Sequence, residues 1–472
     1  SGKATWRDRP TPETPFFHMR TTGVSHESSL HFTQKQMQQQ KTITDPSAVS
    51  VPPYFPDTPT FRYTLARYHD RMREIDNQVT GIVDELRDDG VLDNTILFYF
   101  GDHGGVLPRS KGYLYETGLH VPLVVWLPEK WKHLAPYKAG SRPQGFVEFV
   151  DFGPTVLQLA GVETPQTMDG TPFLGKGISA EEVESRNEAF GYADRFDEKY
   201  EQVRSLRQGR FKYIRSFQPY YPDSLQNNYR YKMLAYEEWR ELFQAGKLNE
   251  VQSAFFESKT IEMLFDVEAD PHEVTNLAYH PDHQQTLLAM RSQLRQRLSD
   301  IHDLSMYPES ALVDEFLPDA VGYGETHRDE IRQLLDVADL ELDAPNEAKM
   351  NELQAALRSQ DRWQRYWAVT ACACGGSEIE SLKDDLLPLL NDPEPTVRIR
   401  AAECFVHWGE EQGKAALLDV LKTSDSSTVA LIALNSVVYL RDHVGIKFEP
   451  SEIVVKARGG EVARRLEYLG VE

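Results

Sequence analysis

Two apolar runs joined by a glycine-containing loop, within residues 94–128, constrain the fold more than any other feature of this sequence. The first run, residues 95–100, is rich in strand-forming side chains and leads directly to an acid and an imidazole, Asp102 and His103. The second run spans residues 121–127. In an open α/β sheet, ligands bind beyond the carboxyl ends of the strands. The pattern therefore predicts an α/β fold with a metal or anion site on this loop.

Four polar residues are candidates for this site. Asp102 offers a hard oxygen ligand and His103 an imidazole, although adjacent Asp and His residues also often cap loops. Lys111 is close enough in sequence to neutralise a bound anion, and His26 follows a predicted short strand, where it can donate a hydrogen bond to an anion. Taken alone, Lys111 and His26 are equally compatible with ordinary surface residues.

The rest of the N-terminal two thirds reads as a mixture of helices and short strands. Apolar residues recur every three or four positions over 61–88, which predicts an amphipathic helix ended by Asp89-Gly90. Residues 147–159 predict a strand or loop leading into a helix with Pro154 in its first turn. We expect a mostly parallel sheet with helices, followed by a smaller antiparallel sheet. The other predicted strands cover residues 16–22, 190–193, 203–206, 211–214 and 262–270, and a helix is predicted over 283–298.

A third polar cluster lies beside the predicted strand at 190–193. Asp194 and Arg195 are followed by further acids, and Arg195 has the geometry to bind a carboxylate or sulfate through two hydrogen bonds. A loop of ordinary salt bridges is the alternative interpretation.

Helical repeats are predicted after about residue 324. Three similar segments place Ala368, Ala401 and Ala433 at spacings of 33 and 32 residues. Helix pairs repeating at this period stack into a solenoid, and the segment DPEPTVRIRAA resembles the HEAT repeat. The repeats predict either a docking surface for a partner or a stabilising C-terminal cap.

The composition excludes some partners. With 51 basic and 73 acidic residues, the net charge of −22 argues against nucleic acid and against anionic membranes, although acidity alone also keeps proteins soluble. An anion site in this chain needs local cations. The three cysteines have no metal-ligand spacing and are predicted to be buried thiols, namely Cys372, Cys374 and Cys404. No run of about 20 apolar residues is present, and the chain starts without a signal-peptide pattern.

Several segments together resemble the type I sulfatases, within the alkaline-phosphatase-like superfamily. They are DGVLDNTILFYFGDHG, KGYLYE followed by GLHVPLVVWLPE, VDFGPTVLQLAGVETPQTMDG, RSLRQGRFKYIRSF and LFDVEADPHEVTNLA. The similarity covers roughly residues 1–305, and LPRSKGYLYE is most similar to the bacterial branch akin to heparan N-sulfatases. It implies an alkaline-phosphatase-like α/β fold with one divalent cation, usually Ca²⁺. It also implies a formylglycine nucleophile made from a C/S-x-P-x-R motif.

The resemblance assigns roles to residues of this sequence. Asp102 and His103 match metal ligands, although the family more often has Asn at the second position. Lys111 and His26 match residues that contact the sulfate and are the expected catalytic residues. The remaining candidates, which are expected to bind substrate, are His120, Asp194 and Arg195.

The sequence departs from the family in lacking a C/S-x-P-x-R motif and the acidic pair of the family's first strand. We therefore expect the C-terminal portion of a longer sulfatase, inactive without the missing segment, rather than a non-catalytic relative. The expected parts are residues 1–160 of the catalytic α/β domain, an antiparallel subdomain and linker over 161–324, and HEAT-like repeats over 325–472.

The resemblance implies a hydrolase of sulfate esters or sulfamates on saccharides, located in the periplasm or outside the cell. The alternatives are a phosphodiesterase or phosphonate monoester hydrolase of the same superfamily, and a non-catalytic scaffold that binds a protein partner or a second copy of itself through the HEAT-like repeats.

Overall fold

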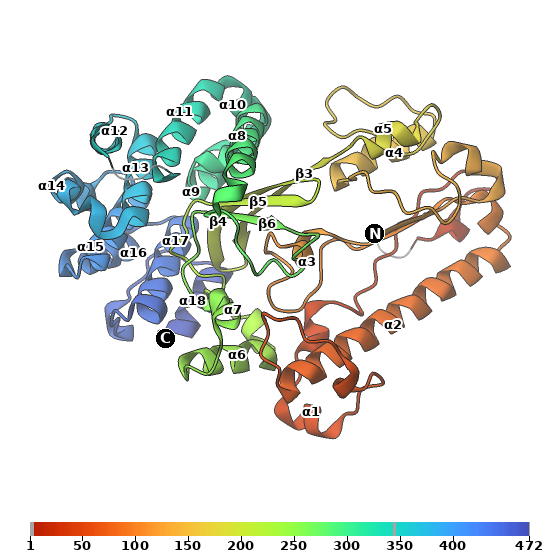
Figure 1. Ribbon diagram of the computed structural model, residues 1–472, viewed down its shortest axis with the longest axis horizontal. Helices are drawn as coiled ribbons and strands as arrows, with labels where there is room; N and C mark the ends of the chain where they lie inside the picture. The colour runs from red at the N-terminus through yellow and green to blue at the C-terminus, as the bar shows by residue number, and fades with distance from the viewer. Residues whose placement is uncertain (1–3, 343–345, 472) are drawn as a thin grey trace.

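The computed structural model describes residues 4–342 and 346–471, which form three regions across the molecule (Figure 1). An α/β region lies at the right of the view, a four-stranded sheet in the middle and a helical region at the left. The candidate site residues are shared between the first two regions.

The longest element is helix α2, Pro59–Asp88, as the apolar spacing predicts. It begins at Thr58, whose hydroxyl accepts a hydrogen bond from the Phe61 amide at 3.2 Å. Pro59 is tolerated in the first turn because its missing N–H has no helical partner there. The predicted helix near residue 154 is also confirmed, as α4, Phe152–Leu159.

The two apolar runs form strands β1, Leu97–Phe100, and β2, Leu123–Trp126. They pair antiparallel, with Leu97 opposite Trp126. The expectation of a mostly parallel sheet is therefore wrong for the residues that the structure describes. Parallel neighbours need a crossover, usually a helix packed on the sheet. The connection here holds only the four-residue helix α3, Glu116–Leu119, and brings the chain straight back beside β1.

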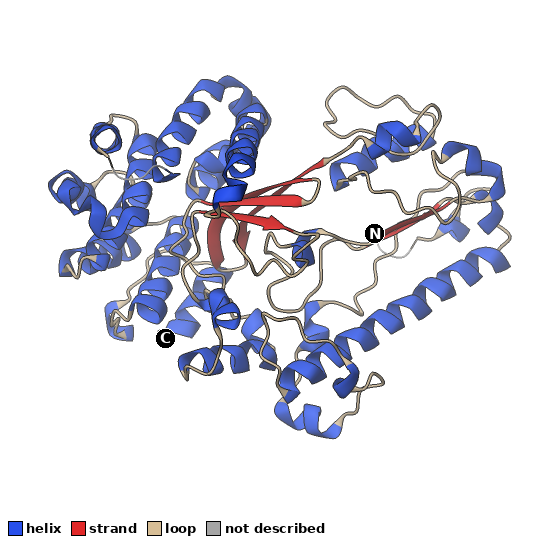
Figure 2. Cartoon of the chain, in the orientation of Figure 1, coloured by secondary structure: helices blue, strands red, loops and turns tan. Residues whose placement is uncertain are grey.

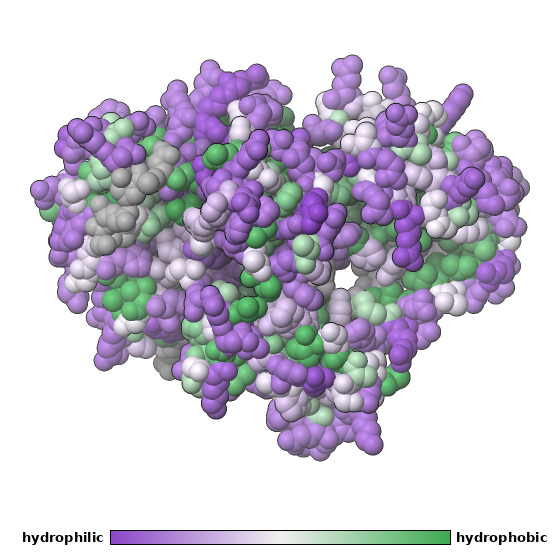
Figure 3. Space-filling view, viewed as in Figure 1, coloured by the Kyte–Doolittle hydropathy of each residue, from purple (hydrophilic) through white to green (hydrophobic). Residues whose placement is uncertain are grey.

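Only one face of this strand pair is covered. Phe98 and Val125 pack with the buried side chains of Phe173 and Leu174. On the other face, Val124 is 58% exposed and Trp126 is 40% exposed. The surface in Figure 3 is mostly hydrophilic, and apolar side chains gather toward the right of that view.

The strand predicted over residues 16–22 is absent. This segment is extended but pairs with no other strand described by the structure, and Phe17 is 77% exposed. An alternating apolar pattern predicts a strand only where a neighbour supplies the hydrogen-bond ladder.

The central sheet is antiparallel in the order β3-β4-β5-β6, as predicted for the second sheet. Its Leu206 and Tyr213 are opposite each other in register and pack with Leu294 of helix α8 in one apolar cluster. The strands are β3, Glu188–Phe196; β4, Lys199–Gln208; β5, Phe211–Ser216; and β6, Glu262–Asp266; helix α8 is Gln284–Asp300.

The helical region confirms the repeat prediction. Ala368, Ala401 and Ala433 are completely buried in α13, α15 and α17, which pack in succession. Cys372 and Cys404 are buried here, as expected, and Cys374 is half-buried. The apolar core of these helices is continuous with that of the central sheet, so the repeats are not a separate appendage.

Helices predominate outside the two sheets (Figure 2). Those not yet described are α1, Gln34–Gln39; α5, Ala180–Glu184; α6, Leu234–Gln244; α7, Glu250–Ser253; α9, Glu309–Ala311; α10, Ala320–Thr326; α11, Arg328–Asp339; and α12, Glu347–Leu357. The repeats contain α13, Arg362–Gly375; α14, Lys383–Leu386; α15, Pro395–His407; α16, Glu411–Thr423; α17, Ser427–Tyr439; and α18, Gly460–Leu469. None of the described helices is both long and apolar enough to span a bilayer.

Candidate active site

The loop after β1 is held closed by its own backbone. The Gly104 amide donates to the carbonyl of Gly118 at 2.9 Å, and the Gly105 amide donates to that of Thr117 at 3.0 Å. A Cβ at Gly104 would lie 2.0 Å from the Thr117 oxygen, so this close approach requires glycine. The backbone thus determines where Asp102 and His103 emerge.

Asp102 and His103 point their polar atoms toward each other. His103 Nδ1 lies 2.8 Å from the Gly104 carbonyl, which only accepts, so Nδ1 donates this hydrogen bond and Nε2 is the ring nitrogen that could bind a cation. Nε2 is 3.6 Å from Oδ1 of Asp102, a separation that two ligands of one cation can have. The Asp102 side chain is 80% exposed.

These two ligands do not make a metal site by themselves. Calcium takes six to eight oxygen ligands. Within residues 4–342 and 346–471, no group of three or more His, Cys, Asp or Glu side chains is arranged to hold an ion. The fit to a cation is therefore partial, with one carboxylate and one imidazole available.

The two expected catalytic residues, 85 positions apart, meet around a buried arginine. Arg230 donates a hydrogen bond to the carbonyl of Lys111 and lies 4.0 Å from the Glu27 carboxylate, next to His26. The Phe196 ring lies 3.8 Å from the Arg230 guanidinium and 5.7 Å from the Lys111 ammonium. The structure thus brings Lys111 and His26 together, although the sequence separates them.

Glu27 is a buried acid within this group of cations. Burial raises its pKa above the ordinary value, and the charges of Arg230, Lys111 and His26 oppose that rise. His26 is exposed and directs Nδ1 to the Ser28 hydroxyl at 2.9 Å.

Glu27 and Arg230 were not predicted from the sequence. The available signal was the run from Gln226 to Lys232, in which basic and aromatic residues alternate at its end. Such a run is typical of anion-contacting loops, but nothing in the sequence shows that it returns to Lys111.

The third predicted histidine lies at the edge of a charged network. His120 Nδ1 is 3.5 Å from the carboxylate of Glu116, which also pairs with Arg207 and with Lys212 at 2.9 Å. Although burial favours the protonated acid, hydrogen bonds from His120 and Lys212 and the charge of Arg207 hold the pKa of Glu116 far below its usual range. The imidazole itself is exposed.

Asp194 forms an ion pair within the central sheet, and Arg195 forms one with the region that follows it. Asp194 accepts from Arg204 at 2.8 Å and from the Ser305 hydroxyl at 3.1 Å. Arg195 donates to Glu309 at 2.8 Å. These contacts match the salt-bridged alternative, and they occupy the guanidinium edge that a substrate carboxylate or sulfate would need.

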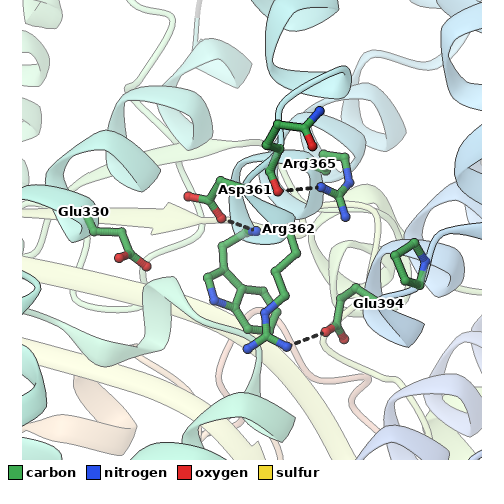
Figure 4. Close-up of a pocket in the computed structure, with 8 residues that line it drawn as sticks. Glu330, Asp361, Arg362, Arg365 and Glu394 are labelled. Carbon is green, nitrogen blue, oxygen red and sulfur yellow. Dashed lines mark hydrogen bonds and ion pairs between the residues drawn. The ribbon is translucent and has the colours of Figure 1, made fainter.

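A separate cleft of about 530 Å³ lies among the helical repeats (Figure 4). Two of its arginines are already paired: Arg362 reaches to Glu394 at 3.2 Å, and Arg365 pairs with Asp392 at 2.7 Å. The cleft is lined by Glu330, Gln360, Asp361, Arg362, Trp363, Arg365, Pro393 and Glu394. It shares none of the predicted site residues.

The chain matches sulfatase families in its N-terminal half and a repeat family in its C-terminal part. Residues 6–162 match the sulfatase family, and residues 101–227 match the C-terminal region of N-sulphoglucosamine sulphohydrolase. Residues 350–437 match HEAT repeats.

Two curated relatives each match somewhat more than half of the chain. An ulvan-active sulfatase of Formosa agariphila is 38% identical over 267 residues, which is 56% of this chain and 43% of the relative. The human N-sulphoglucosamine sulphohydrolase is 25% identical over 287 residues, 58% of this chain and 55% of the relative. The chain therefore spans about half the length of the curated relatives it matches.

A solved structure of a putative sulfatase from Bacteroides fragilis has a TM-score of 0.39 and 19% identity, covering 60% of each chain. A similarity this low supports no argument about the site.

Proposed function

Because residues 6–162 of this chain belong to the sulfatase family, we propose that the complete protein hydrolyses sulfate esters or sulfamates of saccharides. The observation that most supports this is the meeting of Lys111 and His26 around Arg230 and Glu27. In a chain of net charge −22, a local group of cations is what a sulfate requires for binding.

Each residue has a defined part in this proposal. The Lys111 ammonium neutralises charge that grows on the sulfate oxygens during the reaction. His26 hydrogen-bonds the same group or transfers a proton to the leaving oxygen or nitrogen. Arg230 fixes the backbone of Lys111, and Glu27 balances the buried charge of Arg230.

A divalent cation, Ca²⁺ or another, is part of the proposal. Asp102 Oδ1 and His103 Nε2 would be two of its ligands, and the ion would act as a Lewis acid toward the sulfate. The chain contains no C/S-x-P-x-R motif, so the formylglycine nucleophile and the remaining ligands would come from another part of the complete protein. The chain by itself is then expected to be inactive. The exposed His120 remains a candidate for substrate contact. Asp194 and Arg195 could contact substrate only by giving up their ion pairs with Arg204 and Glu309. A periplasmic or extracellular location remains part of the proposal.

The test is sulfate release from sulfated saccharides by the complete protein. Lys111→Ala should lower kcat about 10²- to 10³-fold, as does removal of a group that stabilises a developing anion elsewhere. Asp102→Ala should lower activity as well. Lys130→Ala is the matched control, because Lys130 is an exposed lysine whose ammonium contacts only the Asn94 amide oxygen and the Trp131 ring among the contacts described. Full activity in both test variants would refute the assignment.

The same assay separates the alternatives. A phosphodiesterase or phosphonate monoester hydrolase would prefer the phosphorylated members of a matched substrate panel. A multifunctional alkaline phosphatase superfamily protein of Trinickia caryophylli is 27% identical over 233 residues, covering 48% of this chain and 38% of that protein, which makes this comparison worthwhile. A scaffold that binds a protein partner through the HEAT repeats would hydrolyse neither class.

A further inference from the structure

A second group of basic side chains surrounds Tyr229, next to the proposed site. The His31 ring centroid lies 4.8 Å from that of Tyr229, and the His26 ring lies 6.2 Å away. The Lys232 ammonium is 5.6 Å from the same centroid. Tyr229 is only half-buried and Lys232 is exposed, so this group can be reached from solvent.

The His31 imidazole is the enclosed member of this group. Its Nε2 is enclosed by protein and has no hydrogen-bond partner among the described residues. Burial, together with the charges of Lys232 and His26, lowers the pKa of His31, so the imidazole is neutral at neutral pH. The enclosed His31 ring packs edge-on against Tyr229, at an interplanar angle of 65°, and so fixes the orientation of the Tyr229 ring.

The Tyr229 group adjoins the Lys111 site through backbone that is firmly held. Asn227 Oδ1 accepts hydrogen bonds from the amides of Tyr229, at 3.1 Å, and Arg230, at 3.0 Å. Arg230 in turn donates to the Lys111 carbonyl. His26 lies near both groups, because its ring is close to Tyr229 and it is next in sequence to Glu27 of the Lys111 site.

We propose that Tyr229, His31 and Lys232 form a subsite for an anionic group, sulfate or carboxylate, on the sugar unit next to the one that is desulfated. The subsite rests on the proposed function for its substrate. The half-buried Tyr229 ring offers an apolar face to the sugar ring, and Lys232 provides a point charge on a flexible stem. His31 acts through Tyr229, because its ring packs edge-on against the tyrosine and holds it in place.

The chemistry of the three residues favours this ligand over a neutral sugar. In an acidic chain, the exposed Lys232, with Lys111 and Arg230 nearby, raises the local positive potential, to which the neutral His31 adds nothing. A substrate with one anionic group is bound by the charge on the Lys111 side alone. A substrate with two anionic groups uses both.

The experiment compares Lys232→Ala with wild-type protein on three disaccharides. One is sulfated only on the hydrolysed unit, one on both units, and one carries a carboxylate on the second unit. We expect Lys232→Ala to raise KM about tenfold, at nearly unchanged kcat, for the doubly sulfated disaccharide, for the carboxylated one or for both. The disaccharide whose KM rises identifies the anion that the subsite prefers. The singly sulfated substrate should be unaffected. Lys247→Ala, at an exposed lysine after α6, is the control.

Calorimetric titration of the same disaccharides keeps the subsite testable if no substrate is hydrolysed. Weaker binding of a doubly anionic disaccharide by Lys232→Ala, at unchanged binding of the singly sulfated one, supports the subsite even then. Tyr229→Leu should weaken binding of all three disaccharides, because each has a second sugar ring. Absence of hydrolysis by wild-type protein refutes the proposed function alone. Equal effects of Lys232→Ala on all three disaccharides, or none on either doubly anionic one, overturn the subsite.

Discussion

Replacing Arg465 with Met should lower the free energy of unfolding by about 3 kcal/mol. Arg465 lies in α18, the last helix, and is completely buried. Its guanidinium donates to the carbonyl of Gln226 at 2.7 Å, to that of Glu198 at 2.9 Å and to Asn435 Oδ1 at 3.1 Å. It thus ties the helical repeats to the loop that carries Arg230.

The magnitude follows from two opposing contributions. Met removes three hydrogen bonds from a charged donor, at about 2 kcal/mol each, or about 6 kcal/mol in all. The Glu198 carbonyl still accepts from Arg195 and Asn435 Oδ1 still accepts from the Tyr200 amide, so only the Gln226 carbonyl is left without a donor among the contacts described. Burial, reinforced by the charge of Arg195, lowers the pKa of Arg465 to about 10 from 12.5, so holding the charged form costs about 3 kcal/mol, which Met avoids. The difference leaves about 3 kcal/mol of destabilisation.

Urea unfolding followed by tryptophan fluorescence measures this difference. Arg464→Met is the matched control, since Arg464 is the neighbouring residue of the same helix and its side chain is 45% exposed. Its ion pairs, to Glu461 at 2.9 Å and to Asp197 at 3.9 Å, lie at the surface and contribute at most about 1 kcal/mol. If Arg465→Met and Arg464→Met unfold within about 0.5 kcal/mol of each other, the argument from the buried hydrogen bonds fails.

Two further predictions, with three variants, test other features of the structure. Burial raises the pKa of Glu341 to about 7 against the opposing charge of Arg215, so the folded protein retains a proton there that the unfolded chain releases near pH 4.5. The stabilisation from this proton is complete below about pH 4.5 and is lost as pH rises to about 7. The free energy of unfolding of the wild-type protein should therefore fall by about 3 kcal/mol between pH 4.5 and 8, and that of Glu341→Gln should not show this fall. Identical urea midpoints against pH in both proteins would contradict this. Gly104→Ala should destabilise by about 2 kcal/mol or more, because its methyl group would lie 2.0 Å from the Thr117 oxygen. Gly81→Ala in α2, where the space is open, should stabilise by up to about 1 kcal/mol, and equal unfolding free energies of the two alanine variants would refute the tight contact.

Local patterns predicted much of the fold. The three-to-four-residue period over α2, Pro59–Asp88, is long enough to exclude a strand, and Thr58-Pro59 marks its start. The short turn around Gly209 joins β4 and β5 as predicted, because two adjacent strands separated by a tight turn can only pair antiparallel. The spacing of Ala368, Ala401 and Ala433 identified the stacked helices for a similar reason, since each helix needs a small residue where the next one packs closely.

The relations that could not be predicted depend on contacts between distant residues. The direction of β2 against β1 follows from the path of the intervening chain, which no apolar pattern records. Whether residues 16–22 pair depends on the presence of a neighbouring strand. The approach of Arg230 to Glu27 joins positions more than 200 residues apart, so neither sequence segment shows it by itself.

The contacts between the helical repeats and the rest of the chain favour a stabilising cap over a docking surface. Asn435 of α17 exchanges two hydrogen bonds with the backbone of Tyr200, both at 3.1 Å, in the strand that follows Phe196. Arg465 of α18 fixes the loop from Gln226 onward. Gln226 lies four residues before Arg230, and Tyr200 lies four residues after Phe196, whose ring contacts the Arg230 guanidinium. The repeats thus support the loop that carries the proposed anion site, a role that accounts for their buried polar contacts without requiring a protein partner.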